Sequence, residues 1–444
     1  MVHIVEEFEA AERGGVAILR RWCRIGSELF RCIIRSRLAD FFATHNMSWI
    51  FCQVGAREHY AVARALHRQQ KLELLVTDMW VRAENPLGRL KSRLRARFHQ
   101  DLATANVFAP NFRSAAFELG AYSTGVRGWA QIIARNEWFQ NLGVARLSRI
   151  KCTKERRTLV AYSYAALELL KFAHARGWRT VLGQIDAGIQ EERIVAKLYD
   201  ENSSFDSNWQ RAPPEYWSRW QEECALADRI VVNSMWSHAA LVAQGVSAAR
   251  IRVVPLAYEP PQAASTFRRT YPTAFTRSRP LRALFLGQIN LRKGAGPLLE
   301  AMRSLRGEPV EFVFVGPLQI SIPRDLRDDP QVRWIGPVSR EGTSQFYRDA
   351  DVFLFPTFSD GFGLTQLEAQ AWKLPVITTK FCGDVVEDKK NGMLLSELNP
   401  CAMATTIRQC LRDPLLLHKL SANSEVAERF GLAHVGERWL HIFE

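Results

Sequence analysis

The sequence lacks the features that mark membrane-spanning and exported proteins. Its longest apolar runs are broken by Arg, Glu or Gln, so none reaches the length of a transmembrane helix. The first seven residues, Met1 to Glu7, are acidic and do not follow the pattern of a secretory signal peptide. We therefore expect a cytoplasmic location.

Paired cysteines and a dinucleotide fingerprint are also absent. The eight cysteines lie singly along the chain, and none forms a C-x-x-C pair. This spacing indicates neither a zinc site nor a disulfide framework, and reduced thiols agree with the cytoplasm. No G-x-G-x-x-G follows the first strand pattern of either half of the chain, which argues against an NAD-dependent oxidoreductase.

Acidic residues are too few to balance the basic ones, and the net charge is +13. Much of the excess lies in residues 20–37 and in the stretch Arg89–Phe98, which we expect to form a surface helix. A basic balance fits phosphorylated substrates, an anionic membrane surface or nucleic acid. Nucleic acid is not expected, because no motif that reads it accompanies the charge.

Residues 1–45 combine a basic face with an apolar one and predict an N-terminal helical extension. Two interpretations stay open for this extension. It packs on the neighbouring domain, or it lies at the interface of an anionic membrane as a peripheral contact at the inner face.

The chain does contain a regular alternation of strands and helices. Short β-type runs separated by helical patterns predict parallel sheets with right-handed crossovers. The predicted strands are residues 49–54, 72–77, 158–162, 180–184, 229–233 and 251–255, and then 283–286, 311–315, 332–335, 351–355, 375–378 and 392–395. Residues 80–150 show no equally clear pattern.

A stretch rich in proline, serine and threonine interrupts this alternation at residues 256–280. The fold class predicted is therefore α/β, with two Rossmann-like doubly wound domains that face each other across a cleft. The predicted boundaries are an N-terminal domain over 46–260, a linker over 261–280, a C-terminal domain over 281–428, and a final helix over 429–444 that packs back across the junction.

The stretch Phe358 to Thr379 is the strongest candidate for a binding site. A strand pattern comes before it, two glycines follow, and a helical pattern ended by Pro375 comes next. Gly361 and Gly363 let the backbone approach a ligand, and free N–H groups at a helix start attract phosphate. The acids Asp360 and Glu368 can accept hydrogen bonds from hydroxyls. This arrangement suits a nucleotide sugar, although an ordinary βαβ turn with two solvated acids remains the alternative.

A second candidate turn follows the first strand of the C-terminal domain. Gly287 gives a tight exit from the strand, and Arg292 and Lys293 stand just before a helix, where they can neutralise a diphosphate. Both turns follow strands, and the carboxyl ends of parallel strands meet at one edge of a sheet. We therefore expect the two turns to lie close together.

Four separated pieces of sequence carry a resemblance to a known family. They are Leu286-Gly287-Gln288 with Arg292-Lys293-Gly294, Gly336-Pro337-Val338, Asp360-Gly361-Phe362-Gly363 with Glu368, and Pro375-Val376-Ile377. They resemble the donor half of family 4 retaining glycosyltransferases (glycosyl transferases group 1), which have the GT-B fold. Residues 227–234 and 252–256 are also similar to that family, and the resemblance is strong over about 225–400.

The resemblance implies roles for named residues. Asp360, Lys293 and Asp186 would be catalytic: Lys293 would bind the donor diphosphate with Arg292 beside it, and Asp360 would contact the donor sugar. Glu368 would bind the ribose hydroxyls, and Val338 would lie against the base. The remaining donor-binding positions are Gly55, Gly287, Gly361, Phe362, Gly363 and Leu364.

Three positions differ from the family pattern. The first acid is usually Glu and is Asp360 here, and Gln288 stands where an Arg is frequent. A His often follows the fourth strand of the first domain, where this chain has Gln184-Ile185-Asp186. These differences bear on the choice of donor sugar and on the grip on the phosphates.

The resemblance implies a retaining glycosyltransferase that moves a hexosyl group from a nucleotide diphosphate sugar to a hydroxyl acceptor. The expected acceptor is a glycan or a lipid-linked saccharide in surface polysaccharide synthesis. No metal or other cofactor is expected, since the family uses cationic side chains and helix dipoles and the sequence offers no plausible metal-binding D-x-D. The alternatives are a sugar-nucleotide epimerase or phosphorylase of the same fold, a non-catalytic transferase relative, and a basic protein that binds membranes or nucleic acid.

Overall fold

The computed structural model describes residues 47–82, 94, 96–151, 156–202, 205 and 209–444. The predicted N-terminal extension over 1–45 lies outside these residues. So does most of the basic stretch Arg89–Phe98.

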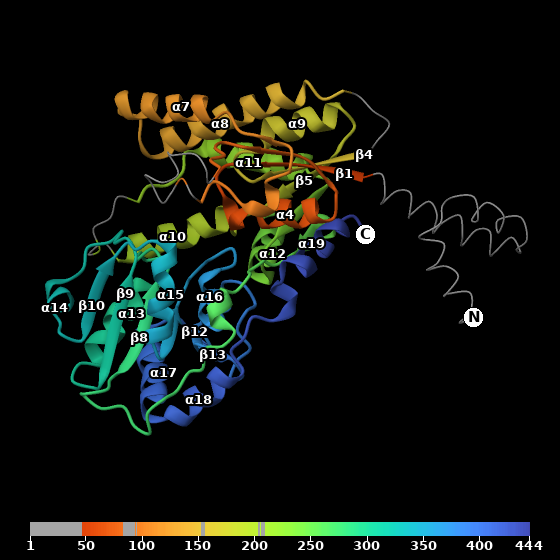
Figure 1. Ribbon diagram of the computed structural model, residues 1–444. Helices are drawn as coiled ribbons and strands as arrows, with labels where there is room; N and C mark the ends of the chain where they lie inside the picture. The colour runs from red at the N-terminus through yellow and green to blue at the C-terminus, as the bar shows by residue number, and fades with distance from the viewer. Residues whose placement is uncertain (1–46, 83–93, 95, 152–155, 203–204, 206–208) are drawn as a thin grey trace, which may run out of the picture.

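The N-terminal domain is built on a parallel seven-stranded sheet of order β3-β2-β1-β4-β5-β6-β7 (Figure 1). Its central strands β1 and β4 carry Trp49, Ile50, Leu159 and Val160, which are fully buried. Strands buried on both faces are typical of parallel sheets that helices cover on both sides. The strands are β1 (Met47–Gln53), β2 (Leu72–Thr77), β3 (Val107–Phe108), β4 (Arg156–Tyr162), β5 (Arg179–Gly183), β6 (Arg229–Val232) and β7 (Ile251–Val253).

Helices cover both faces of this sheet. One face packs against α8, α9 and α11, which lie in the upper layer of Figure 1, and the other packs against α4. The helices of this domain are α4 (Ala61–Arg68), α7 (Asn111–Ser123), α8 (Gly128–Leu147), α9 (Leu167–Ala175), α10 (Ile189–Glu201), α11 (Pro214–Leu226) and α12 (Met235–Ala243). Of these, α7, α8 and α10 were not anticipated from the sequence.

The C-terminal domain repeats the design with a parallel six-stranded sheet of order β10-β9-β8-β11-β12-β13. Its strands are β8 (Leu281–Leu286), β9 (Val310–Val315), β10 (Val332–Gly336), β11 (Val352–Phe355), β12 (Val376–Thr378) and β13 (Gly392–Leu394). Its helices are α13 (Ala295–Ser304), α14 (Arg324–Arg327), α15 (Arg340–Asp349), α16 (Thr365–Ala371), α17 (Pro400–Arg412) and α18 (Pro414–Ala422). The predicted fold class, two doubly wound α/β domains, is confirmed.

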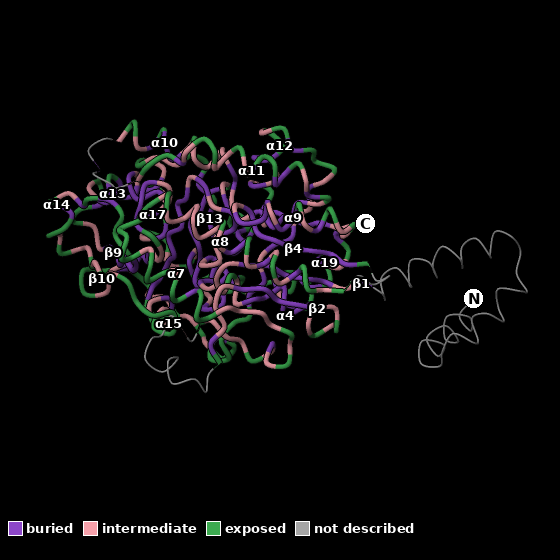
Figure 2. The backbone as a smooth tube through the Cα atoms, turned by 90° about the horizontal axis from the view of Figure 1, so that it is seen from above, coloured by how far each residue is buried: buried purple, intermediate pink, exposed green. Residues whose placement is uncertain are grey.

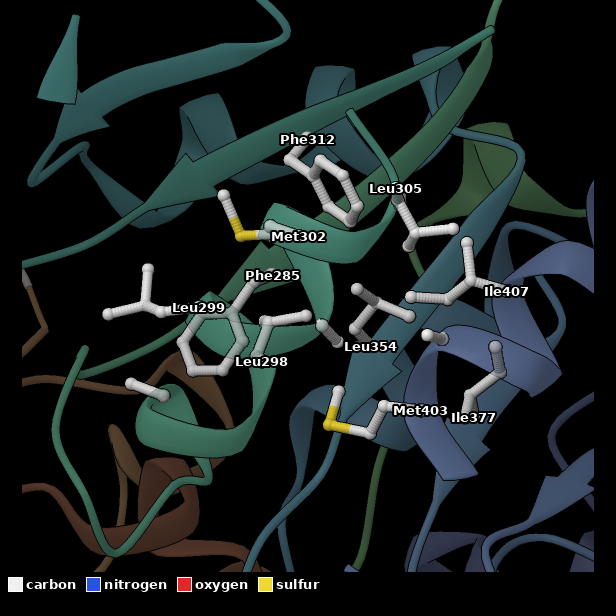
Figure 3. Packing of buried hydrophobic residues seen from close by; sticks show 14 of the residues in the cluster. Phe285, Leu298, Leu299, Met302, Leu305, Phe312, Leu354, Ile377, Met403 and Ile407 are labelled. Carbon is white, nitrogen blue, oxygen red and sulfur yellow. The ribbon is translucent and has the colours of Figure 1, made fainter. Parts of the chain in front are cut away.

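Figure 3 shows how one face of this sheet is filled. Phe285, Phe312 and Leu354 come from three strands and meet Leu298 and Ile407 of the covering helices α13 and α17. All of these side chains are buried. Burial of apolar surface on this scale is the main stabilising contribution to such a domain.

The chain between the two sheets packs on the C-terminal domain. Tyr258 and Ala264 are buried and belong to the core cluster that also contains Leu284 and Trp372. Buried and exposed segments alternate throughout the molecule, with the buried backbone running through its middle (Figure 2). The boundaries proposed above for the domains and the linker remain predictions.

The last helix, α19 (Leu432–Leu440), lies against the N-terminal domain (Figure 1). It packs on α4, where a Cβ on Gly436 would overlap the methyl group of Ala65. Trp439 makes an edge-to-face contact with Phe51 of β1, with ring centroids 5.9 Å apart. The two ends of the described chain therefore share one hydrophobic core.

Candidate functional site

The turn after β11 is held by hydrogen bonds from its own neighbourhood. The hydroxyl of Thr357 donates to the carbonyl of Ser359 (2.9 Å), and the hydroxyl of Thr379 donates to the carbonyl of Thr357 (2.6 Å). The amide of Asp360 donates to the carbonyl of Phe381 (2.9 Å). Asp360 is therefore placed by the backbone at the carboxyl edge of the sheet.

Asp360 forms an ion pair with Lys293 of the other predicted turn. The second oxygen of Asp360 accepts a hydrogen bond from the amide of Phe362 (3.1 Å), and the Lys293 ammonium lies 4.9 Å from the centroid of the Phe355 ring. Burial, together with the charge of Arg292, lowers the pKa of Lys293 below its usual range. The structure thus brings together the basic and the acidic turn, as expected.

Gly294 makes this approach possible. It has φ +79°, a conformation that favours glycine, and a Cβ there would overlap the carbonyl oxygen of Pro356. The amide of Phe358 also donates to the carbonyl of Arg292 (2.8 Å). The loop before α13 is therefore joined directly to the end of β11.

Arg292 links this site to the N-terminal domain. Its guanidinium donates to the carbonyl of Ser359 (2.9 Å) and lies 3.4 Å from a carboxylate oxygen of Glu191 in α10. The hydroxyl of Ser359 donates to the same carboxylate (2.8 Å) and accepts from the indole of Trp236 in α12 (3.1 Å). Helices α10 and α12 of the N-terminal domain thus contact the turn over residues 358–363, which we call the donor-side turn.

Gly361 and Asp186 lie at a second contact between the domains. A Cβ at Gly361 would overlap the carbonyl oxygen of Ile185, so only glycine fits there without displacement. One oxygen of Asp186 accepts hydrogen bonds from Tyr164 (2.5 Å), Gln184 (2.9 Å) and the amide of Gly188 (2.9 Å). Burial raises the pKa of Asp186 to about 6, and the nearby Glu191 contributes in the same direction.

Glu368 lies in the first turn of α16 and is held by a buried tyrosine. The hydroxyl of Tyr347 donates to its carboxylate (2.8 Å), and Tyr347 is 1% exposed. Val338 follows β10 and is 36% exposed, so its side chain is open to a ligand.

A hollow of 280 Å³ lies beside Lys293 on the C-terminal domain. Gly287, Gln288 and Thr365 line it with Lys293. Gly287 has φ +144°, and its carbonyl approaches Gly316 so closely that a Cβ on Gly316 would overlap it. This hollow is the place where a diphosphate can meet the predicted donor-binding residues.

The other predicted donor residues do not all present their side chains to a ligand. Phe362 is buried and packs edge-to-face on Phe430, with centroids 5.9 Å apart. Gly363 has φ +81° and lies against the Phe355 ring, while Leu364 comes just before α16 and is half-buried. Phe362 is therefore a packing residue, because its amide also donates to Asp360 and its carbonyl accepts from the amide of Gly383 (2.8 Å).

Gly55 lies apart from this cluster. Its amide donates to Asp78 (2.8 Å), which Arg97 also binds (2.8 Å). Among the described residues, those lining the 280 Å³ hollow at Gly55 all come from the N-terminal domain. The structure does not bring Gly55 together with Lys293.

The helix after the glycine turn is shorter than predicted. It ends at Ala371, four residues before Pro375, so the prediction that Pro375 ends it was wrong. Lys373 adopts φ +55°, and the amide of Leu374 returns to the carbonyl of Ala369 (3.1 Å), which closes the helix.

The described residues contain no group of three or more His, Cys, Asp or Glu side chains arranged to hold a metal ion. One D-x-D pattern, Asp349-Ala350-Asp351, is present at the amino end of β11, where Asp351 bonds the guanidinium of Arg279 (2.7 Å). In the part of the chain that the structure describes, no helix is both long and apolar enough to cross a bilayer.

Sequence reasoning missed the contributions of α10 and α12. Glu191 and Trp236 reach the donor-side turn from positions more than 100 residues away in the sequence. No local motif marks them, because their role depends on how the two domains meet. A run of acids at the start of α10, Glu191 and Glu192, was the only available signal.

Comparisons with known proteins show what the C-terminal domain is similar to. Residues 280–413 match the family described as Glycosyl transferases group 1. A capsular polysaccharide biosynthesis glycosyltransferase from Staphylococcus aureus is 30% identical over 149 residues, which cover 31% of this chain and 39% of the relative. A D-inositol 3-phosphate glycosyltransferase from Xylanimonas cellulosilytica is 29% identical over 247 residues, covering 50% of this chain and 58% of the relative. Both matches span less than two thirds of the relative's length.

Solved structures agree on the fold of the whole described chain. The Anabaena protein HepE in complex with UDP-glucose has a TM-score of 0.57 at 15% identity and is matched over 99% of its length by 89% of this chain. A sucrose-phosphate synthase from Thermosynechococcus elongatus has the same TM-score at 18% identity. The match covers 89% of this chain and 98% of the synthase. The chain therefore has a GT-B fold, and residues 280–413 of its C-terminal domain are similar to the glycosyl transferases group 1 family.

Proposed function

We propose that the protein is a retaining glycosyltransferase that takes its sugar from a nucleotide diphosphate donor. The observation that carries this proposal is the cluster of Lys293, Asp360 and Arg292 at the contact between the two domains. Two cations beside an open hollow suit a diphosphate, and carboxylates suit sugar and ribose hydroxyls. The matched relatives are named glycosyltransferases, and a structural neighbour solved with UDP-glucose favours the same donor class.

Each side chain has a role in this proposal. Lys293 and Arg292 bind the diphosphate, Glu368 binds the ribose, and Asp360 contacts the sugar once the donor replaces it as the partner of Lys293. The bond between the anomeric carbon and the diphosphate breaks, and a bond to the acceptor oxygen forms. The acceptor proton leaves with the nucleoside diphosphate, and the buried cations stabilise the charge that develops on the leaving group.

We propose that the reaction needs no metal ion, because Lys293 and Arg292 supply positive charge where a cation would otherwise stand. Turnover that persists in excess chelator is the expected result. Loss of turnover with chelator, and recovery with magnesium or manganese, would contradict it.

The acceptor is proposed to be a growing surface glycan or a lipid-linked saccharide. Peripheral contact with an anionic membrane would suit such an acceptor. Exposed apolar side chains on one face of α7, Phe112, Leu119 and Tyr122, support this contact, and Arg113 lies beside them. Co-sedimentation with anionic vesicles, lost in a Phe112→Ser/Leu119→Ser variant, tests it.

The function is tested by a screen for turnover. The protein is incubated with UDP-, GDP- and ADP-sugars and candidate acceptors, and release of the nucleoside diphosphate is measured. Proton NMR of the product then reports its anomeric configuration. The proposal expects release with one donor class and a product with the anomeric configuration of the donor. No turnover and no binding of any nucleotide sugar would overturn it.

A further inference from the structure

A cavity of 710 Å³ opens between the two domains next to the cluster of Lys293, Asp360 and Arg292. Its walls come from α8, α10 and α11 of the N-terminal domain and from the loops after β8 and β9 of the C-terminal domain. Figure 1 shows α10 lying between the two sheets. Arg292 and Asp186 line it, whereas Gly287 and Lys293 line only the hollow on the C-terminal domain. The cavity therefore adjoins the hollow assigned to the diphosphate and shares Arg292 with it.

One wall of this cavity is a set of interlocked aromatic rings. Tyr164 and Tyr216 are stacked with centroids 4.9 Å apart, and Tyr216 meets Trp129 and Trp217 edge-to-face at 4.8 and 5.2 Å. The indole of Trp129 donates to the carbonyl of Gln210 (3.0 Å), which fixes its orientation. Rings held in this way present rigid apolar surface with little entropy left to lose on binding.

The charge of the cavity selects against an anionic occupant. Among the described residues that line it, three are acidic, Asp186, Glu191 and Glu192, and Arg292 is the only basic one. Ionised carboxylates accept hydrogen bonds and cannot donate them, so they bind ligands that carry many donors. Glu192 already accepts from the amide of Ala212 (2.8 Å) through one oxygen, and each carboxylate oxygen can accept more than one bond.

We propose that this cavity binds the acceptor as a neutral saccharide, with C–H faces of sugar rings on Trp129 and Tyr216 and hydroxyls bonded to Glu192 and Asp186. Its volume of 710 Å³ falls within the range of about 300–1,000 Å³ that is typical of ligand sites, and its lining combines aromatic rings with polar groups. Asp186 lies against the Gly361 turn, so a sugar in the cavity places a hydroxyl beside the donor sugar. This inference rests on the proposed transferase function and narrows its acceptor class.

The test uses the full chain and two independent measurements. Saturation-transfer NMR, with UDP present, is recorded for neutral trisaccharides built from hexoses, N-acetylhexosamines or deoxyhexoses, and for inositol 1-phosphate and glucose 6-phosphate. Thermal stabilisation by UDP alone reports the donor site. The variants are Trp129→Ala and Glu192→Gln, with Trp129→Phe as the conservative replacement and Leu415→Ala, whose side chain is 72% exposed on α18, as the exposed control.

We expect the NMR experiment to show saturation transfer from the protein to at least one neutral trisaccharide. The affinity of the protein for this trisaccharide should fall about tenfold in Trp129→Ala and Glu192→Gln, recover in Trp129→Phe, and stay unchanged in Leu415→Ala. UDP should stabilise all five proteins. The proposal is overturned if no neutral saccharide binds, if only the phosphorylated ligands bind, or if Trp129→Ala binds as wild type does. Absence of UDP stabilisation in every protein would instead count against the donor site.

Discussion

At the scale of single residues, the site depends on glycines placed where backbones touch. Gly294 brings the Lys293 loop against Pro356, and Gly361 brings the donor-side turn against Ile185 of the other domain. Local sequence predicted that Gly361 lets the backbone approach a ligand, and it made no such prediction for Gly294. It could not say that the neighbour of Gly361 is protein backbone from the N-terminal domain, because that contact joins positions far apart in the chain.

Replacing Gly361 by Ala is expected to lower turnover by about tenfold or more. The added methyl group would overlap the carbonyl oxygen of Ile185 and push the donor turn away from Asp186, and small displacements of reacting groups have large effects on rate. Steady-state turnover of nucleotide sugar measures the change. Gly120→Ala is the matched control, since a Cβ there meets open space within α7. Equal turnover of Gly361→Ala and wild type would show that the contact is not needed.

The hydroxyl of Tyr347 orients Glu368 through a hydrogen bond, and the substitution Tyr347→Phe removes this hydroxyl while keeping the ring. Tyr347→Phe is expected to weaken UDP binding by about tenfold, because a hydrogen bond to a charged group contributes about 1.5–3 kcal/mol. Titration calorimetry with UDP gives the dissociation constant. Tyr271→Phe is the control, since that hydroxyl donates to the carbonyl of Asp351 (3.0 Å). If both variants bind UDP equally well, Tyr347 does not act through the ribose-binding acid.

At the scale of elements, the regular strands could be predicted almost completely. Period and composition located twelve of the strands to within two residues, for example β2 over Leu72–Thr77. The two-residue β3 and helices α7, α8 and α10 escaped prediction. In α7 most residues are exposed, so no apolar stripe faces a core, and its composition does not distinguish helix from loop.

The junction of α9 and α11 contains a buried acid that should titrate. Glu223 accepts hydrogen bonds from the amides of Tyr164 (2.7 Å), Ala166 (2.8 Å) and Leu167 (3.1 Å). Burial raises the pKa of Glu223 to about 7 from an ordinary 4.5. The folded state thus holds this proton more tightly than the unfolded chain does.

The free energy of unfolding should therefore fall as the pH rises from about 4.5 to about 7, by on the order of 1–3 kcal/mol from this group. Glu223→Gln cannot titrate and should lose that part of the pH dependence. Urea unfolding of both proteins across this pH range, followed by tryptophan fluorescence, measures the slopes. Parallel slopes would contradict the assignment.

Helix α19 is expected to stabilise the N-terminal domain although it comes last in the chain. Trp439 is 3% exposed against Phe51, and Trp439→Ala should lower the free energy of unfolding by about 3–5 kcal/mol. Chemical denaturation tests this, with Tyr122→Ala as the exposed aromatic control. A loss no larger than that of the control would mean that α19 adds little to the core.

At the scale of the whole molecule, two domains meet through the residues that are proposed to bind the donor. Arg292 and Ser359 contact Glu191, and Gly361 contacts Ile185. The sequence predicted two facing domains and the pairing of the Lys293 and Asp360 turns, since both follow parallel strands of one sheet. It could not predict which helices face the turns, or that α8, α10 and α11 enclose an aromatic cavity, because domain docking has no local sequence signal.

The central claim is that Lys293 and Glu368 hold a nucleoside diphosphate at this contact. Titration calorimetry with UDP on wild type, Lys293→Ala, Glu368→Ala and Lys197→Ala tests it most directly, where Lys197 has a 75% exposed side chain on α10. We expect wild type and Lys197→Ala to bind UDP with equal affinity. Lys293→Ala and Glu368→Ala should bind at least about tenfold more weakly, since each loses a charge-assisted hydrogen bond. Binding of UDP to both site variants with the affinity of wild type would contradict the account.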